Sequence, residues 1–224
     1  MSGLKIIANP AITPVSRIEA RQHLRLDDDV DDSQVRSYIQ AGTDWAENYT
    51  NRFFISRTCQ MMLDGARELD TPLWEGMRTG HYSRPLSSHI ELAANPVISV
   101  ESIKYYADDD TQTLWAASNY YVDTFSEPAR IVLRDGGTYP TDMRAFNGLE
   151  INFTAGYGAN ASSVPEAIRL AILQYVTFLY EHRGEFEGSV LPQPPSSLAA
   201  LLNPYRMLRF GSTPYNSVIM SGIS

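Results

Sequence analysis

The segment from Ser163 to Gly184 constrains the fold more than any other part of the chain. It starts with Ser-Val-Pro-Glu, which is typical of a capping box with proline in the first turn, and Gly184 is a natural stop. Its apolar residues cover more than one helical face: Ile168, Leu170, Ala171, Ile172, Leu173, Tyr175, Val176, Phe178 and Leu179. Such a helix must be covered on most sides, so we expect it at the centre of the fold or against another subunit.

Two further helices are predicted before this segment and a short one after it, over residues 13–26, 32–51 and 198–202. The first has two candidate starts: Thr13 followed by Pro14, or a capping box formed by Ser16 and Glu19. The second carries apolar residues at three-and-four spacing, which predicts a helix with one apolar stripe.

The middle of the chain has a different pattern. Short alternating or β-branched runs, separated by Asp, Gly, Asn and Pro, lie at residues 57–65, 97–109, 119–125, 129–137 and 149–156. The runs are too closely spaced for crossover helices, so we expect antiparallel hairpins and meanders. Residues 65–88 show no periodicity and are predicted to be a long excursion.

Together these patterns predict an α+β fold, in which the N- and C-terminal segments build a helical core and the middle of the chain forms antiparallel hairpins. We expect a single domain over residues 1–224. Its parts are a helical core, a β-rich segment and a C-terminal tail, at residues 1–54 with 163–204, 55–156 and 205–224.

The composition is that of a globular protein, with 43% hydrophobic and 20% charged residues and no pattern of a secretory signal. Eighteen basic and twenty-six acidic side chains give a net charge of −8. A surface of that sign repels polyphosphate, so a groove that grips DNA is not expected. The single cysteine, Cys59, excludes an internal disulfide, and its alternating surroundings predict a buried, inert thiol.

The stretch "AGYGANA" raises the question of a nucleotide site, because Gly156, Gly158 and Ala161 fit a dinucleotide-binding fingerprint. In that fingerprint the helix opens within the glycine motif and a second parallel strand follows. Here the capping signals place the helix start at Ser163, after the motif. We therefore expect the glycines to serve a turn that requires positive φ.

A calcium loop is a second candidate, because Asp27, Asp29 and Asp31 fit the first, third and fifth places of an EF-hand. The sixth place should be glycine and is Asp32, while the twelfth should be glutamate and is Tyr38. The four histidines lack metal-binding spacing, and no nucleophile motif occurs. We therefore predict no catalytic, cofactor-binding or metal-binding residue and no cofactor.

With these segments in place, the chain resembles the head–tail connector (adaptor) proteins of long-tailed bacteriophages and gene transfer agents. The likeness spans roughly residues 10–206 and consists of many moderate matches. They are the opening "TPVSRIEARQHLRLDDDVDDSQVRSYIQAGTDWAENYTNRFF", then "RTCQMMLDG", "NPVISVESIKYYADDD", "INFTAGYG", "VPEAIRLAILQYVTFLYEHRGE" and "LLNPYR".

The resemblance implies a structural virion protein and not an enzyme. Members of the family form a ring, commonly of twelve copies, in the neck of the particle, which is assembled in the host bacterial cytoplasm. The portal protein lies on one side of the ring and the stopper or tail proteins on the other. DNA passes through the ring without specific binding, no membrane is involved, and a negatively charged lumen would let the DNA slide past.

The resemblance also suggests roles for particular residues. For core or ring packing we single out Tyr175, Phe178 and Leu179, and for portal docking Tyr205, Arg206, Leu208, Arg209 and Phe210. The plainer alternative for both sets is ordinary core packing or an unattached chain end. Two other functions stay open: another neck or tail-completion protein, and a nucleotide-dependent enzyme that uses the 156–161 turn.

Overall fold

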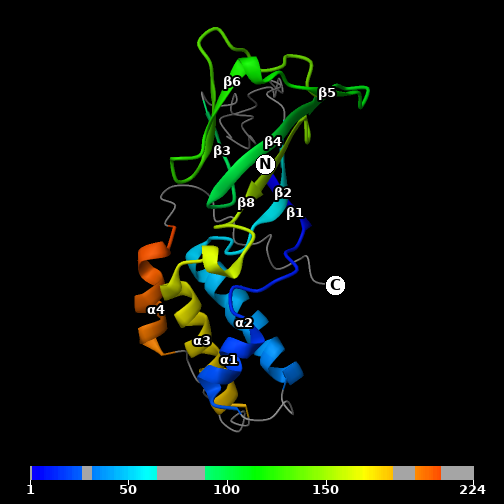
Figure 1. Ribbon diagram of the computed structural model, residues 1–224. Coiled ribbons are helices and arrows are strands. Elements are labelled where there is room, and N and C mark those ends of the chain that lie inside the picture. Colours follow the sequence, from blue (N-terminus) through cyan, green and yellow to red (C-terminus); the bar gives the residue numbers. More distant parts are fainter. Residues whose placement is uncertain (1, 27–31, 65–88, 184–194, 208–224) are drawn as a thin grey trace, which may run out of the picture. The chain divides into compact units, whose positions relative to one another are not determined.

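The structure, a computed structural model, describes residues 2–26, 32–64, 89–183 and 195–207. The chain divides into two compact units (Figure 1). The β unit contains the described residues of 2–9 and 57–155, and the helical unit contains those of 10–56 and 156–207. The organisation as one domain over residues 1–224 stays a prediction.

The β unit holds two sheets, and every strand pair in them is antiparallel, as the spacing of the runs predicted. The larger sheet has the order β1-β2-β8-β4-β5, with strands Ser2–Ala8, Arg57–Leu63, Leu149–Ala155, Val97–Tyr106 and Gln112–Leu114. The smaller has the order β3-β7-β6, with strands His89–Glu91, Arg130–Leu133 and Tyr120–Asp123. A 3₁₀ turn, η1 (Ala117–Asn119), precedes β6.

Fully buried apolar residues occupy every second position from Leu149 to Phe153 in β8, and they give the larger sheet one apolar face. Leu149, Ile151 and Phe153 are fully buried, and the strand register places Cys59 and Val100 beside Phe153. The Cys59 thiol is also fully buried, which confirms the predicted burial. This face supplies the apolar core of the sheet.

The opposite face of the same sheet is polar and centred on Glu150, which is only 6% exposed. The Tyr106 hydroxyl donates to the Glu150 carboxylate at 2.5 Å, and the Asn152 amide donates to it at 2.7 Å. Burial alone would raise the pKa of Glu150, but these hydrogen bonds outweigh burial and lower it. The same bond to Glu150 raises the pKa of the Tyr106 hydroxyl.

The helical unit contains four described helices, α1 (Arg17–Leu24), α2 (Asp32–Thr50), α3 (Glu166–Glu181) and α4 (Ser196–Leu202), with 3₁₀ turns η2 (Ala161–Ser163) and η3 (Asn203–Tyr205). They enclose one apolar cluster, to which α2 contributes Val35 and Ile39 and α3 contributes Ile168 and Ile172. Among the described helices, none combines the length and apolar character that crossing a membrane requires.

Gly42 allows α2 and α3 to approach closely. A Cβ atom at this position would lie 3.3 Å from Cδ1 of Tyr175 and 3.5 Å from Cγ2 of Ile172. A larger residue would push these side chains away, so the helix spacing depends on the glycine.

The two helix starts show which capping signals the chain uses. Helix α1 starts with the capping box of Ser16 and Glu19, so that candidate start is confirmed and the Thr13 start is wrong. The capping box predicted at Ser163 is also wrong, because the N-cap of α3 is Pro165 and no side chain caps it. Ser163 instead ends η2, where its side chain fills the space beside Gly158.

Arg169 joins three parts of the helical unit. Its guanidinium forms ion pairs with Glu19 of α1 and with Glu166 of its own helix, the latter at 2.7 Å. Its Nε also donates to the Pro14 carbonyl oxygen at 3.1 Å. The arginine side chain is mostly buried, so these bonds fix the start of the chain's first helix against α3.

The glycines of "AGYGANA" form a turn after β8, as predicted. Gly156 has φ +136°, and a Cβ atom there would lie 2.6 Å from both the backbone N and the Cα of Ser56. The Ser56 N–H donates to the Gly158 carbonyl at 2.9 Å, which holds the turn against the chain that follows α2. Gly156 is therefore required by a close backbone contact, whereas Gly158 leaves room for the Ser163 side chain.

The five strand runs read from the sequence correspond to β2, β4, β6, β7 and β8. Residues 1–54 were assigned to the helical core, whereas Ser2–Ala8 forms strand β1 of the β unit. The short strands β3 and β5 were also not predicted. The excursion at 65–88 and the stop at Gly184 lie outside the described residues.

We expect the substitution Gly156→Ala to lower the free energy of unfolding by about 2 kcal/mol or more, because the new Cβ meets backbone atoms and the positive φ is unfavourable for alanine. Gly3→Ala is the matched control, since no described atom lies within 4 Å of a Cβ atom there. Urea unfolding followed by circular dichroism measures both. Equal stability of the two variants would contradict the role given to this turn.

Candidate interaction surfaces

A row of five rings runs along α2 and α3, and we call it the aromatic stack: Tyr49, Trp45, Tyr175, Phe178 and His182. Trp45 and Tyr175 stack nearly parallel, with centroids 4.8 Å apart and planes at 9°. Tyr49 continues the row on one side at 5.6 Å, and Phe178 and His182 continue it on the other at 6.1 and 4.5 Å. All five rings are half-buried. The aromatic stack thus packs α2 on α3 and still offers ring surface to solvent.

The structure shows where the three residues predicted for core or ring packing lie on α3. Tyr175 and Phe178 belong to the aromatic stack, and Leu179 is half-buried on the same helix. Leu170, also on α3, is 38% exposed. Helix α3 is therefore not covered on all sides by the described residues, although its apolar residues cover most of its circumference.

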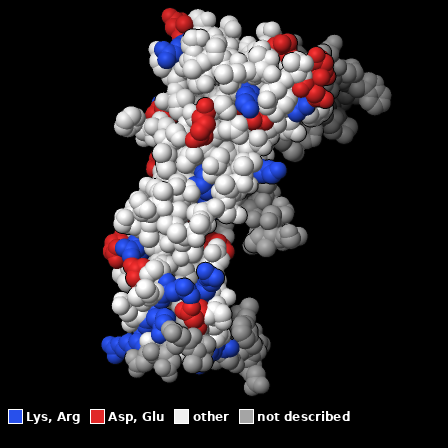
Figure 2. Space-filling view, turned by 45° about the vertical axis from the view of Figure 1, so that its right-hand side comes forward, with Lys and Arg blue, Asp and Glu red and all other residues white. Residues whose placement is uncertain are grey.

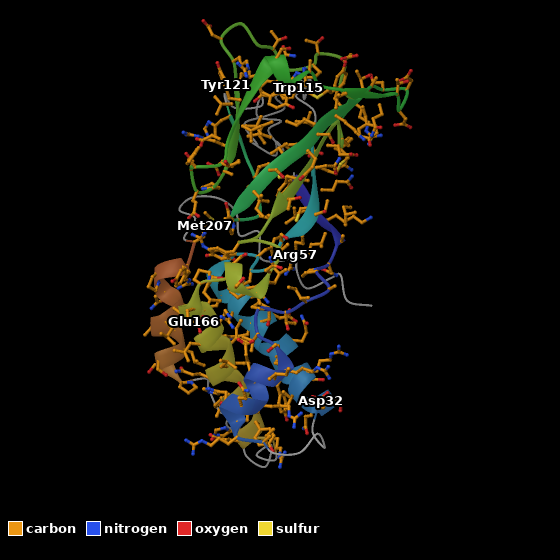
Figure 3. The ribbon with its side chains drawn as sticks, in the orientation of Figure 1. Asp32, Arg57, Trp115, Tyr121, Glu166 and Met207 are labelled. Atoms are coloured by element: carbon orange, nitrogen blue, oxygen red, sulfur yellow. The ribbon has the colours of Figure 1, made fainter. Side chains whose placement is uncertain are left out.

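The start of the C-terminal tail is fixed to the end of α2. The Met207 N–H donates to the Thr50 carbonyl at 2.9 Å, and the Asn51 amide donates to the Met207 carbonyl at 3.3 Å. The Tyr205 carbonyl accepts from Arg52 at 2.6 Å. Met207, labelled in Figure 3, is buried, so the described chain ends at a well-anchored residue.

Of the five residues proposed for portal docking, two are described and they differ in exposure. Tyr205 is half-buried against the helical core, while Arg206 is exposed with its guanidinium 5.0 Å from the centre of the Tyr49 ring. Leu208, Arg209 and Phe210 lie outside the described residues. Arg206 and the aromatic stack therefore share one surface, at Tyr49.

A second surface lies in the β unit, at the loop between β6 and β7. Phe125 at this loop is 100% exposed, and Tyr121 of β6, labelled in Figure 3, is 54% exposed. The Arg134 guanidinium lies 3.8 Å from the centre of the Tyr121 ring. Tyr120 beside it is buried, as expected for adjacent residues of a strand. The exposed Phe125 was not singled out from the sequence.

Asp123 holds this loop in one conformation. Its carboxylate accepts from the N–H groups of Phe125 and Ser126 at 3.1 and 3.2 Å, from the Ser126 hydroxyl at 2.7 Å and from Arg130 at 2.8 Å. The Ser126 hydroxyl and the Arg130 guanidinium lower the pKa of Asp123 to about 2. The sequence contains one signal that could have predicted this loop. An Asp side chain in a turn often accepts a hydrogen bond from the backbone N–H two residues later.

Figure 2 shows basic side chains gathered toward the lower end of the view and acidic ones at its upper right. In Figure 2 most of the visible surface is neither acidic nor basic. Among the described residues, no group of three His, Cys, Asp or Glu side chains could hold a metal ion. The calcium candidates Asp27, Asp29 and Asp31 lie outside the described residues, and Asp32 pairs with Arg17.

A hollow of about 400 Å³ is lined by Arg17, Ile18, Arg21 and Asp32. It brings together two guanidinium groups and one carboxylate, and that carboxylate, Asp32, pairs with the Arg17 guanidinium. The nucleotide alternative has no support either, because β8 pairs with antiparallel neighbours and α3 starts at Glu166, beyond the glycine turn.

Part of the chain matches a known protein family. Residues 18–75 match the family model described as phage gp6-like head–tail connector protein. This segment covers most of α1, all of α2 and all of β2. The resemblance to head–tail connector proteins is thereby confirmed over these residues. No curated protein matches the chain.

Comparison with solved structures extends the likeness to nearly the whole chain. A chain from the neck of an empty gene transfer agent particle, computed with C6 symmetry, has 24% identity and a TM-score of 0.70, over 95% of this chain and 100% of that one. A chain from the virion of a native gene transfer agent particle has 23% identity and a TM-score of 0.68, over 94% and 99%.

A third chain, from the neck of a native particle computed with C12 symmetry, has 22% identity and a TM-score of 0.68, over 95% and 100%. At these identities the matches establish a shared fold. The α+β class predicted from the sequence is therefore confirmed, both by the elements themselves and by these relatives.

We expect the amide NMR signals of Phe125 and Ser126 to stay constant from roughly pH 5 to pH 3, because a carboxylate with a pKa of about 2 is only about 10% protonated at pH 3. Because the pKa of Asp123 is lowered by folding, its ionised carboxylate stabilises the loop fully at pH values above its ordinary pKa of 3.8. This stabilisation is lost as the pH falls through about 2. Signals that move with a midpoint near 3.8 would show that Asp123 does not hold the loop.

Proposed function

We propose that this chain is a structural protein in the neck of a phage or gene transfer agent particle. It is a head–tail connector subunit that joins the portal to the tail or stopper. The observation that carries the proposal is the family match at residues 18–75, within a fold that nearly the whole chain shares with neck chains. The site of action is then the virion neck, after assembly in the bacterial cytoplasm.

A ring of twelve copies is the assembly we propose. The C6 and C12 symmetries of the two similar neck structures support it. A cyclic ring requires two different complementary patches on each subunit, since its contacts are heterologous. The aromatic stack, together with Leu179, is our candidate for one of these patches, because half-buried rings gain contact area when a neighbour covers them.

The role we propose is mechanical and involves no catalysis. The one carboxylate among the described residues that line the hollow, Asp32, pairs with Arg17, and the family match is to connector proteins. The net charge of −8 supports a channel wall that repels DNA phosphates, so that DNA passes without being held. Cryo-electron microscopy of the particle neck tests the assignment. Density for this chain at another position of the tail, away from the portal, would make it a different tail-completion protein.

The aromatic stack can be tested with a pair of variants on α3. We expect Phe178→Ser to reduce incorporation into the neck at least tenfold, because the substitution removes a ring from the proposed contact. Leu170→Ser is the control, since Leu170 is exposed on the same helix and takes part in none of the ring contacts of the aromatic stack. Quantitative mass spectrometry of purified particles measures incorporation. A Phe178→Ser subunit that melts earlier but still assembles would assign the aromatic stack to core packing alone.

We also propose that Tyr205, Arg206, Leu208, Arg209 and Phe210 dock on the portal. A charge reversal at Arg206 and Arg209 is expected to weaken portal binding at least tenfold, because an arginine anchor becomes a repelling carboxylate. The matched control is the double reversal Arg25→Glu with Arg36→Glu, which changes two exposed arginines of the helical unit. Binding to purified portal, measured by biolayer interferometry, should be lost in the variant at Arg206 and Arg209 and retained in the control. Equal loss in both variants would indicate a general charge effect.

A further inference from the structure

Arg206 is held at the C-terminal end of α2 through both of its chain neighbours. The Tyr205 carbonyl accepts a hydrogen bond from Nε of Arg52 at 2.6 Å. The Met207 N–H donates to the Thr50 carbonyl at 2.9 Å. Because the backbone is bound on each side of Arg206, this exposed arginine side chain starts from a fixed point.

The ring of Tyr49 lies under the Arg206 guanidinium, with 5.0 Å between the guanidinium carbon and the ring centre. This distance is within the range of a cation–π interaction. The ring is itself held in place. Its hydroxyl donates to Oδ1 of Asn203 at 2.7 Å, and it stacks on Trp45 with 5.6 Å between the ring centres. Tyr49 is therefore a fixed platform for the guanidinium.

The guanidinium on this platform is open to a partner. No described carboxylate forms an ion pair with Arg206, whereas four other arginines each pair with an aspartate or glutamate: Arg17, Arg130, Arg144 and Arg169. An arginine that stacks on a ring keeps a planar fork of N–H donors, which matches the geometry of a carboxylate or a phosphate. The described chain thus positions this cation without supplying its anion.

The surroundings of Arg206 favour a protein carboxylate over a nucleic-acid phosphate. A protein that binds DNA neutralises several phosphates, and a net charge of −8 opposes such binding. The rings beside Arg206, Tyr49 and Trp45, are half-buried, and aromatic rings of this kind are enriched in protein interfaces. Residues 188–224 contain two arginines and no aspartate or glutamate, so no acidic side chain of this segment neutralises Arg206.

We propose that Tyr49 and Arg206 form a binding site for a carboxylate in an acidic segment of the portal. This proposal rests on the proposed function, which assigns Arg206 to portal docking. Arg206 binds the carboxylate through its N–H fork, and Tyr49 is the positioning residue that holds the guanidinium in place. A guanidinium that is already ordered loses less side-chain entropy when the portal binds.

A double-mutant cycle on the full-length subunit tests this pairing, with binding to purified portal measured by biolayer interferometry. Tyr49→Leu should weaken binding about threefold and Arg206→Ala about tenfold, because the first removes the platform and the second removes the donors. The two substitutions together should weaken binding no more than Arg206→Ala alone. Effects that multiply in the double variant, or full binding by Tyr49→Leu, would overturn the proposal.

Two further variants separate positioning from a general loss of stability. Tyr49→Phe keeps the ring and should restore most of the binding that Tyr49→Leu loses. Tyr38→Leu is the matched control, because it removes a half-buried tyrosine ring from the first half of the same helix. This control should bind the portal as the unchanged protein does. Equal weakening by Tyr38→Leu and Tyr49→Leu would overturn the role given to Tyr49.

A measurement on the free subunit tests the site without the portal. An oligoglutamate peptide is titrated into the isotope-labelled subunit, and the Nε–H signal of Arg206 is followed by NMR. The signal should shift with oligoglutamate and not with oligoglutamine, and the shift should be lost in Tyr49→Leu. Arg36, an exposed arginine of α2, is the internal control and should shift less. An equal shift at Arg36, or an equal response of Arg206 to a short DNA duplex, would overturn the proposal.

The peptide titration also separates failure of this site from failure of the proposed function. An Arg206 signal that ignores the peptide, in a chain that cryo-electron microscopy finds beside the portal, would overturn the carboxylate site alone. A signal that responds, in a chain found away from the portal, would overturn the portal as the source of the carboxylate and assign the site to another partner.

Discussion

The close contact between α2 and α3 determines the organisation of the helical unit. Gly42 lets Tyr175 and Ile172 pack directly against the backbone of α2, and Trp45 then stacks on Tyr175. Because the helices are this close, their aromatic side chains form a continuous row at the margin of the core and remain half-buried. The same contact therefore stabilises the subunit and creates the surface that we propose for assembly.

The β unit depends on a buried polar group as well as on apolar packing. Its larger sheet is apolar on one face and polar on the other, and the buried Glu150 is stabilised by hydrogen-bond donors on its own and the neighbouring strand. A buried carboxylate with hydrogen-bond partners fixes the strand register, because a slip would leave it without them. The unit can then present the Phe125 loop on a rigid support.

Many helices and strands of the fold could be predicted from the sequence because the patterns that identify them are local. The apolar spacing of α2, the Ser16–Glu19 capping box and the alternation of β8 each identify their own element. Strand β1 was missed because its pairing with β2 joins residues fifty or more positions apart. The cap at Ser163 failed because the side chain is used beside Gly158, a contact that exists only after the turn has formed. The exposure of Phe125 likewise depends on the folded loop, whereas Tyr175 and Phe178 were identified through helix periodicity.

The only sulfhydryl group of the protein lies at the centre of the larger sheet, where solvent does not reach it. A particle that leaves the reducing interior of a bacterium meets dissolved oxygen and peroxides. Thiolate formation requires hydration, so a fully enclosed thiol resists conversion to sulfenic acid and exchange with other thiols. In the particle neck that we propose for it, the protein would therefore pass from one redox environment to another without covalent change at this thiol.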